Sequence, residues 1–357
     1  MALRTENEFG NVDFGDDRLN RRFAIIVEQL SQNAGQLINL ACEDWAATKA
    51  AYRFFDNSKV SPTQISNAHV QATLRRAELQ ISNTEETLLV IQDTTYLNYS
   101  HHPSTTGLGE ISGWKDRNPG GGKMEVSGLL LHSSLALTTE GVPLGFLDQK
   151  LWTRTKPIGL ITKSKKNMTR IPIEQKESFR WLEAMRNVAT AISKPSQVIH
   201  IGDRESDIFE FFHEAREQKS NFLVRIRDAQ RGLSDGGRIF DPLEDVSRKG
   251  TFKIHVKNKN GKSRVVTMEV KYYFAYILPS ASKKHLPAIP AHVITVREVA
   301  PPNGEDQIVW NLLTNLRITS FRDALQKIKW YEMRWNIDIC QPNYPLCSLS
   351  SSDALAA

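Results

Sequence analysis

The sequence predicts an α/β protein in which a mixed β-sheet core follows a helical N-terminal region and carries an inserted β-rich region. Three observations support this fold class. The first eighty or so residues have helical periodicity, short apolar runs alternate with helical stretches from about residue 84, and residues 228–316 mostly alternate like strands, without a clear long helix. The 357 residues are enough for two or three domains.

Composition and charge narrow the functional classes. The excess of 46 Lys and Arg over 40 Asp and Glu gives a net charge of +6, which permits a polyanionic partner without requiring one. The three cysteines argue against a disulfide scaffold or a cysteine-based metal site. No apolar run approaches the length of a membrane span, and the first ten residues do not resemble a secretory signal. We therefore expect a cytosolic protein without membrane contact.

The helical N-terminal region contains three helical stretches, and a capping box marks the start of the third. Ser61 stands as N-cap, Pro62 at the first helical position and Gln64 at the third, which is the pattern of a helix start. The three stretches cover residues 16–33, 44–57 and 61–80.

Two of these helices carry basic stripes. Arg18, Arg21 and Arg22 recur at one-turn spacing on the first helix, and Lys49 and Arg53 do the same on the second. Each stripe can contact DNA phosphates, although a solvated helix face explains any single stripe equally well.

The stretch from about residue 84 to residue 228 alternates strands with helices. Apolar runs flank Glu140-Gly141, which predicts a hairpin at that point. The other predicted elements are a strand, a helix, a buried strand, a helix and a strand, at residues 87–97, 177–192, 198–201, 207–218 and 221–228. This order describes one α/β unit around a mixed sheet.

The last helix follows the β-rich insertion. Ser320 and Asp323 can cap its N-terminus. Pro342 and Pro345 cannot continue a helix, and the residues after them have neither helical nor strand periodicity. We therefore expect an unstructured tail over residues 341–357.

Three carboxylates are candidates for a shared metal site. Asp93 and Asp203 each follow a buried apolar strand, the usual position of a ligand-binding group in an open α/β sheet. Tyr331, Arg334 and Asp338 are spaced +3 and +4 on the last helix, so they share one face. If that helix packs across the sheet edge, Asp338 joins the two strand-end acids. The alternative for a single strand-end aspartate is a turn cap or an ion pair.

The residue types indicate which ion and which chemistry. Three carboxylates without a Cys or His cluster suit Mg²⁺ or Mn²⁺, hard ions that prefer oxygen ligands. Two such ions can activate a water or a 3′-hydroxyl and stabilise the leaving oxygen of a phosphodiester during in-line displacement.

Several short motifs resemble one known family. They are AYRFFDN in the helical N-terminus, IQDTTYLNYS around Asp93, GDRESDI around Asp203, FLVRIR after it and YEMRW in the last helix. With these motifs the chain resembles, over nearly its whole length up to Asp338, the DDE transposases of the bacterial insertion-sequence-four group, which contains the Tn-five cut-and-paste transposase. The family's final signature is Tyr, two residues, Arg, three residues, Glu, six residues, Lys. Asp338 stands at the Glu position and Pro345 at the Lys position.

This resemblance implies a ribonuclease-H-like fold with an inserted β subdomain. It implies that Asp93, Asp203 and Asp338 are catalytic ligands of Mg²⁺ or Mn²⁺. It also divides the chain into a helical DNA-binding domain, the first part of the catalytic core, the inserted β subdomain, the last core helix and an aberrant tail, over residues 1–82, 83–227, 228–317, 318–340 and 341–357.

The resemblance further implies DNA contacts within the catalytic core. Tyr331 and Arg334 would hold the DNA backbone at the cleavage site, and Arg225 matches a basic position beside the DNA. Trp310 matches the aromatic residue on which family members stack a flipped terminal base, and such stacking is worth roughly 1–3 kcal/mol per base. From the residues alone, a core tryptophan explains Trp310 equally well, and a surface ion pair is the commoner reading of Arg225.

The predicted function is that of a cut-and-paste DNA transposase acting on double-stranded transposon ends and target DNA in the bacterial cytosol, associated with the nucleoid. Intact family members form dimers, and the family's C-terminal dimerisation region has no counterpart in this sequence. Two accounts compete: a diverged but working enzyme, or a copy whose reading frame was broken or cut inside the catalytic helix. The tail favours the second, so we expect weak or absent strand transfer. Asp338 withdraws the carboxylate by about 1 Å relative to Glu, a misplacement that can cost about a hundredfold in rate. Two alternatives stay open: a non-catalytic DNA-binding inhibitor of transposition, and a nuclease of the same fold that cleaves without joining.

Overall fold

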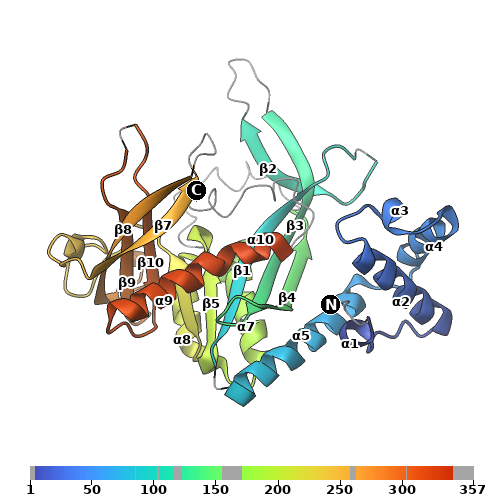
Figure 1. The fold of residues 1–357 in the computed structure, drawn as a ribbon, viewed down its shortest axis with the longest axis horizontal. Coiled ribbons are helices and arrows are strands. Elements are labelled where there is room, and N and C mark those ends of the chain that lie inside the picture. The colour runs from blue at the N-terminus through green and yellow to red at the C-terminus, as the bar shows by residue number, and fades with distance from the viewer. Residues whose placement is uncertain are drawn as a thin grey trace.

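The computed structural model describes residues 5–84, 86–102, 104–115, 123–154, 171–257, 263–302 and 304–340. The predicted tail, and Pro345 with it, lies outside the described residues. The described chain forms a helical N-terminal region at one end of a long mixed β-sheet, with helices on both faces of the sheet (Figure 1).

The N-terminal region is a small helical unit with its own aromatic core. Phe14, Phe23 and Phe54 are buried against one another with ring centroids 5.3–5.8 Å apart. The helix start predicted at Ser61 is confirmed: Gln64 Oε1 accepts from Ser61 N at 3.1 Å, as in a capping box, while Ser61 Oγ accepts from Thr63 N, one position earlier than in that motif, at 3.2 Å. The helices are α1 (Thr5–Phe9), α2 (Asp17–Gln32), α3 (Ile38–Ala41), α4 (Trp45–Phe55) and α5 (Pro62–Thr84).

The strands form one mixed sheet of ten strands within the described residues. They are β1 (Leu88–Asn98), β2 (Gly109–Lys115), β3 (Lys123–Leu137), β4 (Pro143–Trp152), β5 (Val198–Gly202), β6 (Asn221–Arg225), β7 (Gly250–Lys257), β8 (Ser263–Ile277), β9 (Ile289–Glu298) and β10 (Val309–Thr314). The order is β2-β3-β1-β5-β6-β10-β9-β8-β7, with β4 also paired to β3. Among the described strands, the pairings of β1 with β5 and of β5 with β6 are parallel, and the other pairings are antiparallel. This arrangement is consistent with the predicted ribonuclease-H-like core.

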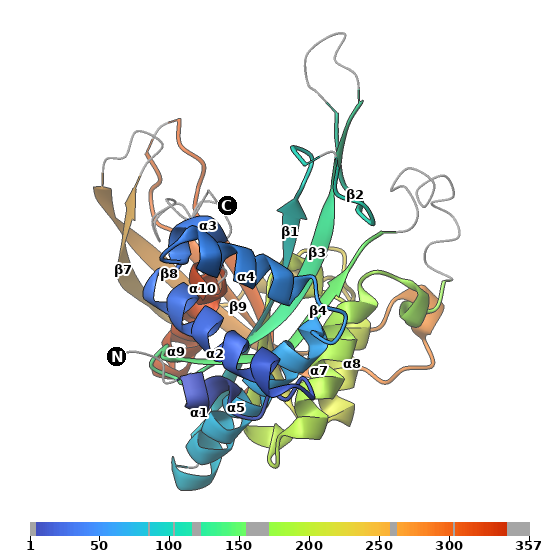
Figure 2. The same cartoon turned by 90° about the vertical axis from the view of Figure 1, so that its right-hand side faces the viewer.

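Helices cover both faces of this sheet (Figure 2). On one face, Leu89 and Ile91 of β1 pack in a core with Ile328 of α9. On the other, Leu88 and Val90 pack against α5 and α7. Successive strand residues point to opposite faces, so β1 separates the two layers. The covering helices are α7 (Phe179–Ala191), α8 (Phe209–Glu217), α9 (Phe321–Glu332) and α10 (Asn336–Cys340).

Short 3₁₀ turns connect several of these elements. They are η2 (Ile173–Gln175), η3 (Pro195–Gln197), η4 (Arg204–Ser206), η5 (Asp241–Leu243), η6 (Ala281–Lys283) and η7 (Met333–Trp335). The hairpin predicted at Glu140-Gly141 is confirmed between β3 and β4. Gly141 has a φ of +89°, a conformation that favours glycine.

The last helix differs from the prediction in one respect. Its N-terminus has the expected capping box of Ser320 and Asp323. The single regular helix predicted through Asp338 is wrong, however, because α9 ends at Glu332, the 3₁₀ turn η7 follows, and only then does α10 begin. A 3₁₀ turn has 3.0 rather than 3.6 residues per turn, so η7 rotates α10 relative to α9.

The β-rich insertion continues the core sheet. β10 pairs with β6 on one side and with β9 on the other, and both pairings are antiparallel. The residues of β7, β8 and β9 share a hydrophobic cluster with β1, β5 and α9. The insertion is therefore packed as an extension of the core.

Candidate functional site

The two strand-end aspartates lie at the same edge of the sheet. Because β1 and β5 are parallel and Ile91 pairs with Ile201, Asp93 and Asp203 follow that pair by the same number of residues. Asp93 is still within β1, opposite Ser133 of β3, whereas the pairing of β1 with β5 ends at Ile91, so the sheet fixes its backbone on the β3 side. The prediction that both acids emerge at one sheet edge is confirmed.

Asp203 is held by the turn that follows β5. It is the N-cap of η4, and its carboxylate accepts a hydrogen bond from Glu205 N at 2.8 Å. A carboxylate at such a position satisfies a backbone donor that has no partner within the helix. The local turn thus orients Asp203 without burying it completely.

Asp338 comes from a helix that covers the sheet, whereas the other two acids belong to or follow its strands. α10 packs against β1, which brings Asp338 close enough to raise the pKa of Asp93. Figure 1 shows α10 crossing the sheet beside β1. Asp203 and Asp338 therefore both act electrostatically on Asp93, and their joint role as metal ligands stays a prediction.

The electrostatics of the site show crowded negative charge. Burial raises the pKa of Asp93 from its usual 3.8 to about 7. Arg334 opposes this rise, while Asp203 and Asp338 add to it. Burial likewise raises the pKa of Asp338, again opposed by Arg334. The Asp93 side chain retains 21% exposure, so the group is accessible from solvent. Carboxyl groups in this situation favour either a proton or a cation.

A cluster of cationic and phenolic side chains borders the acids. Arg334 Nη1 lies 3.9 Å from Asp93 Oδ1, and the Arg334 guanidinium lies 4.0 Å from the centre of the Trp335 ring. The buried Nε of Arg334 has no hydrogen-bond partner among the residues that the structure describes. An unsatisfied buried guanidinium donor is costly, which suits Arg334 for an anion that the structure does not contain.

Tyr331 and Arg225 complete this border. Burial raises the pKa of the Tyr331 hydroxyl, opposed by Arg334 and Arg225. Burial also lowers the pKa of Arg225; Tyr331 opposes that effect, and the nearby cations Arg204 and Arg334 add to it. Three arginines close together favour an anion between them. The structure thus brings together the predicted Arg225, Tyr331 and Arg334.

Trp310 has a different environment. Its side chain is 4% exposed and belongs to the same hydrophobic cluster as Trp330 and Ile328 of α9. The described structure therefore places Trp310 in the core. Its stacking on a flipped base stays a prediction, and that role requires the indole to become accessible.

The three carboxylates are ligands of the type that a divalent cation prefers, but in the described residues they are not arranged as a formed metal site. Asp93, Asp203 and Asp338 supply the hard oxygen donors that Mg²⁺ and Mn²⁺ prefer. Within the described residues, however, no group of three or more His, Cys, Asp or Glu side chains is arranged to hold a metal ion. Arg334 beside Asp93 compensates part of the negative charge in this arrangement.

The predicted basic residues of the N-terminal helices lie mainly on the surface. Arg18 and Arg21 on α2 are exposed and Arg22 is half-buried, while Lys49 and Arg53 on α4 are both exposed. Arg21 Nε also donates to the carbonyl oxygen of Asp17 at 3.2 Å. Most of these cations are therefore accessible at the surface, and their contact with DNA stays a prediction.

Two aromatic residues on α4 were not predicted. Trp45 is 75% exposed and Tyr52 is 54% exposed. Together with Lys49 and Arg53 they follow the spacing +4, +3 and +1, which gathers the four on one side of α4. The helical spacing of these two aromatics with the basic pair was visible in the sequence, whereas their exposure was not. We call these four residues the α4 face.

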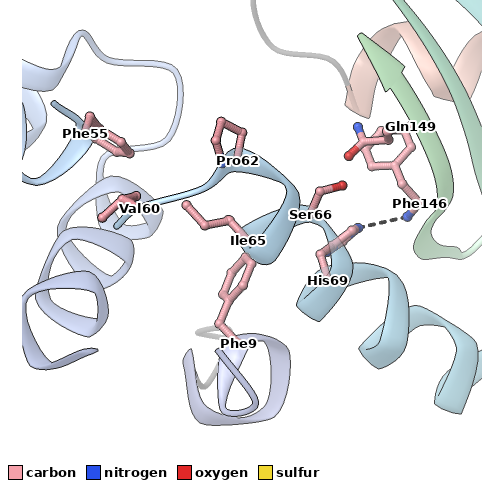
Figure 3. Close-up of a pocket in the computed structure, with 9 residues that line it drawn as sticks. All are labelled: Phe9, Phe55, Val60, Pro62, Ile65, Ser66, His69, Phe146 and Gln149. Carbon is pink, nitrogen blue, oxygen red and sulfur yellow. Dashed lines mark hydrogen bonds between the residues drawn. The ribbon is translucent and has the colours of Figure 1, made fainter. Parts of the chain in front are cut away.

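A pocket lies between the N-terminal helices and strand β4 of the core sheet. It has a volume of about 450 Å³ and is lined mostly by apolar side chains of α1, α5 and β4 (Figure 3). His69 spans it: its Nε2 accepts from Phe146 N at 2.9 Å and its Nδ1 contacts Glu8. Burial lowers the pKa of His69, opposed by Glu8. The lining residues include none of the candidate acids, so the pocket belongs to the junction of the two regions.

One comparison with known proteins bears on these residues. A protein-family model described as transposase DNA-binding matches residues 2–60, which include α1 to α4 and the exposed cations. The match supports a DNA-binding role for the N-terminal helices. Separately, no helix in the described residues is long and apolar enough to cross a membrane.

Proposed function

We propose that this protein is a cut-and-paste DNA transposase of the insertion-sequence-four type. The N-terminal helices bind transposon ends, and the sheet edge at Asp93, Asp203 and Asp338 cleaves and transfers strands. The observation that supports the proposal is that Asp203 and Asp338 act electrostatically on Asp93 beside Arg334, Tyr331 and Arg225, in a chain whose residues 2–60 match a transposase DNA-binding family.

The cationic side chains hold the phosphodiester in this proposal. Arg334 is beside Asp93 and has a donor without a partner among the described residues, so a phosphate oxygen can accept from it while the acids stay on the other side. Arg225 and Tyr331 contribute to the same phosphate cradle. Interactions of this kind position the scissile phosphorus for in-line attack.

The carboxylates supply the other half of the site. When bound, Mg²⁺ or Mn²⁺ would lower the pKa of an attacking water and stabilise the leaving oxygen. In the cleavage step a water oxygen bonds to phosphorus while the bond from phosphorus to the 3′-oxygen breaks, and the 3′-oxygen takes up a proton. The products are a 3′-hydroxyl and a 5′-phosphate. In strand transfer, that 3′-hydroxyl replaces water as the attacking group on a second phosphodiester.

The α4 face is the proposed DNA contact of the N-terminal region. Lys49 and Arg53 meet the phosphates, and the exposed rings of Trp45 and Tyr52 pack against sugars or bases in the groove. Phosphate contacts of this type give affinity and register rather than base choice, so the sequence preference depends on the remaining contacts.

The test is a cleavage assay with the purified chain and DNA that contains the inverted repeats flanking its gene. We expect binding with ethylenediaminetetraacetate present, and nicks that leave a 3′-hydroxyl once Mg²⁺ or Mn²⁺ is added. Products in which one DNA end is joined to another strand distinguish a transposase from a nuclease that only cleaves. Binding without any nick under either ion contradicts the catalytic part of the proposal.

A non-catalytic DNA-binding inhibitor of transposition is the second candidate. The observation that favours it is the absence, among the described residues, of a closed group of three metal-binding side chains. In that case the chain occupies DNA ends without cutting them, and its addition to an active transposase of the same ends lowers excision. A chain that nicks DNA by itself excludes this candidate.

A further inference from the structure

A buried arginine connects the two strand ends that carry the candidate acids. Arg180 lies on α7, on the sheet face opposite to α9 and α10, and its side chain is 7% exposed. Its guanidinium donates three hydrogen bonds. Nε donates to Thr94 Oγ1 at 2.8 Å, Nη1 donates to the carbonyl oxygen of Glu177 at 3.0 Å, and Nη2 donates to the Glu205 carboxylate.

The first contact reaches the strand that carries Asp93. Thr94 is the next residue of β1, so its side chain points to the α7 layer while Asp93 points to the α10 layer. Thr94 Oγ1 also contacts His132 Nδ1 at 2.9 Å, and His132 Nε2 contacts Gln92 Oε1 at 3.3 Å. Because Thr94 accepts from Arg180, its own proton goes to His132, and His132 then donates to Gln92. This series of hydrogen bonds holds Gln92 and Thr94, the two residues that flank Asp93, on the sheet face opposite to the Asp93 side chain.

The last contact reaches the turn that carries Asp203. Glu205 is held at both ends: its backbone N donates to the Asp203 carboxylate at 2.8 Å, and its side chain accepts from Arg180. A bound Glu205 therefore fixes η4, whose geometry orients Asp203. The planar guanidinium can bridge Thr94 and Glu205 at a fixed separation, which a lysine ammonium cannot reproduce.

We infer that Arg180 is a positioning residue that sets the separation between Asp93 and Asp203. It contacts the neighbours of both acids and neither acid itself. The inference rests on the proposed function for its consequence in catalysis, but the mechanical link between β1 and η4 stands on the hydrogen bonds alone. Partners that orient metal-binding groups in this way typically contribute ten- to a hundredfold in metal affinity or activity.

The test compares Arg180→Met with a matched control on the same helix. Arg186 also pairs with a glutamate, Glu214, at 2.6 and 2.8 Å, but its side chain is 42% exposed and touches neither strand end. Arg186→Met therefore removes an arginine–glutamate pair from α7 without breaking the link. Thr94→Val and Thr94→Ser give a second, smaller perturbation, since only serine keeps the hydroxyl.

Three readouts follow these variants: amide hydrogen exchange without metal, Mn²⁺ binding by calorimetry, and cleavage with DNA affinity. For Arg180→Met we expect about tenfold faster exchange at Glu205 and Ser206, roughly tenfold weaker Mn²⁺ binding, and cleavage slower by about ten- to a hundredfold at unchanged DNA affinity. Arg186→Met and Thr94→Ser should match the wild type, and Thr94→Val should follow Arg180→Met to a lesser degree.

The outcomes separate this inference from the proposed function. If Arg180→Met speeds exchange no more at η4 than elsewhere, or no more than Arg186→Met does, the positioning role is wrong. If the wild type neither cleaves DNA nor binds Mn²⁺ but exchange still rises locally at η4 in Arg180→Met, the proposed catalysis fails while the link between β1 and η4 stands.

Discussion

The N-terminal helices and the sheet edge present their chemistry in opposite ways. On α4 the charged and aromatic groups stand exposed on one regular helix, and Trp45 is 75% exposed. At the sheet edge the predicted charged groups come from β1, the turn after β5, β6 and the α9–α10 segment; Arg334 is buried and the others are half-buried. The first surface is assembled by local periodicity, whereas the second exists only when distant elements pack together.

This difference has an energetic consequence. Exposed cations on α4 lower the stability of the folded protein little, because they stay hydrated. When they bind DNA phosphates, they release the counterions of those phosphates. At the sheet edge, burial and like charges raise the pKa of Asp93 to about 7. The folded protein therefore holds unfavourable charge at the edge until a proton or cation arrives. Binding and chemistry should accordingly be separable by substitution.

The largest expected effect is on cleavage. Asp203→Asn keeps the shape of the side chain and removes the charge, so we expect the cleavage rate to fall by about a thousandfold or more, while DNA affinity changes less than about twofold. Rates come from single-turnover cleavage and affinities from fluorescence anisotropy. Exposed Asp56→Asn is the control. A cleavage rate within tenfold of the wild type removes Asp203 from the site.

A longer carboxylate side chain at position 338 tests whether the reach of Asp338 limits cleavage. Asp338→Glu extends the group by about 1 Å toward Asp93, and we expect cleavage to rise by up to about a hundredfold if reach limits the present site. Mg²⁺ titration of the cleavage rate is the measurement. An unchanged or lower rate shows that the packing of α10 already places Asp338 correctly.

The pH dependence of stability reports directly on the crowded charge. The pKa of Asp93 in the folded protein is about 7 against 3.8 ordinarily. Between these values the folded protein holds a proton that the unfolded chain releases, so the stability from this group is complete below pH 4 and is lost as pH rises through 7. We expect Asp93→Asn to stabilise the protein by about 1–2 kcal/mol at pH 8 and negligibly at pH 4.

Urea unfolding at the two pH values measures this difference. Asp56→Asn again serves as the exposed control. Added Mg²⁺ should stabilise the wild type at pH 8 and affect Asp93→Asn less. A variant that is less stable than the wild type at pH 8 shows that the interaction with Arg334 outweighs the burial of the carboxylate.

The smallest effects are expected on α4. Lys49→Ala and Arg53→Ala should each weaken DNA binding several-fold, similarly for all sequences, and lower the slope of log K against log salt by about one. Lys194, an exposed lysine on the α7–β5 connection, is the control for a loss of charge elsewhere. An unchanged salt slope places the phosphate contacts on another face, such as α2.

The sequence predicted those parts of the site that depend on local order. Asp93 and Asp203 were found because an apolar strand precedes each, and Ser320 with Asp323 marked the start of α9. The break at η7 was not predicted, since Met333 to Trp335 fit a helical pattern as well as a 3₁₀ turn. The 3₁₀ turn is followed by α10, which packs on β1, and no local pattern records that contact.

Long-range contacts account for the remaining differences. Arg180 reads as an ordinary helix residue, and its partners Thr94 and Glu205 are 86 and 25 residues away in the chain. The burial of Trp310 follows from packing against α9, so the strand pattern alone could not decide between core and surface. Pairing of β10 with both β6 and β9, which joins the insertion to the core, likewise has no local signature.

The measurement that tests the division of labour most directly is single-turnover cleavage at increasing protein concentration for the double variant Lys49→Ala with Arg53→Ala and for Asp203→Asn. We predict that the double variant needs more protein but reaches the wild-type cleavage rate at saturation, whereas Asp203→Asn binds at the wild-type concentration and does not cleave. A double variant that stays slow at saturation, or an Asp203→Asn protein that loses DNA affinity, would contradict the account.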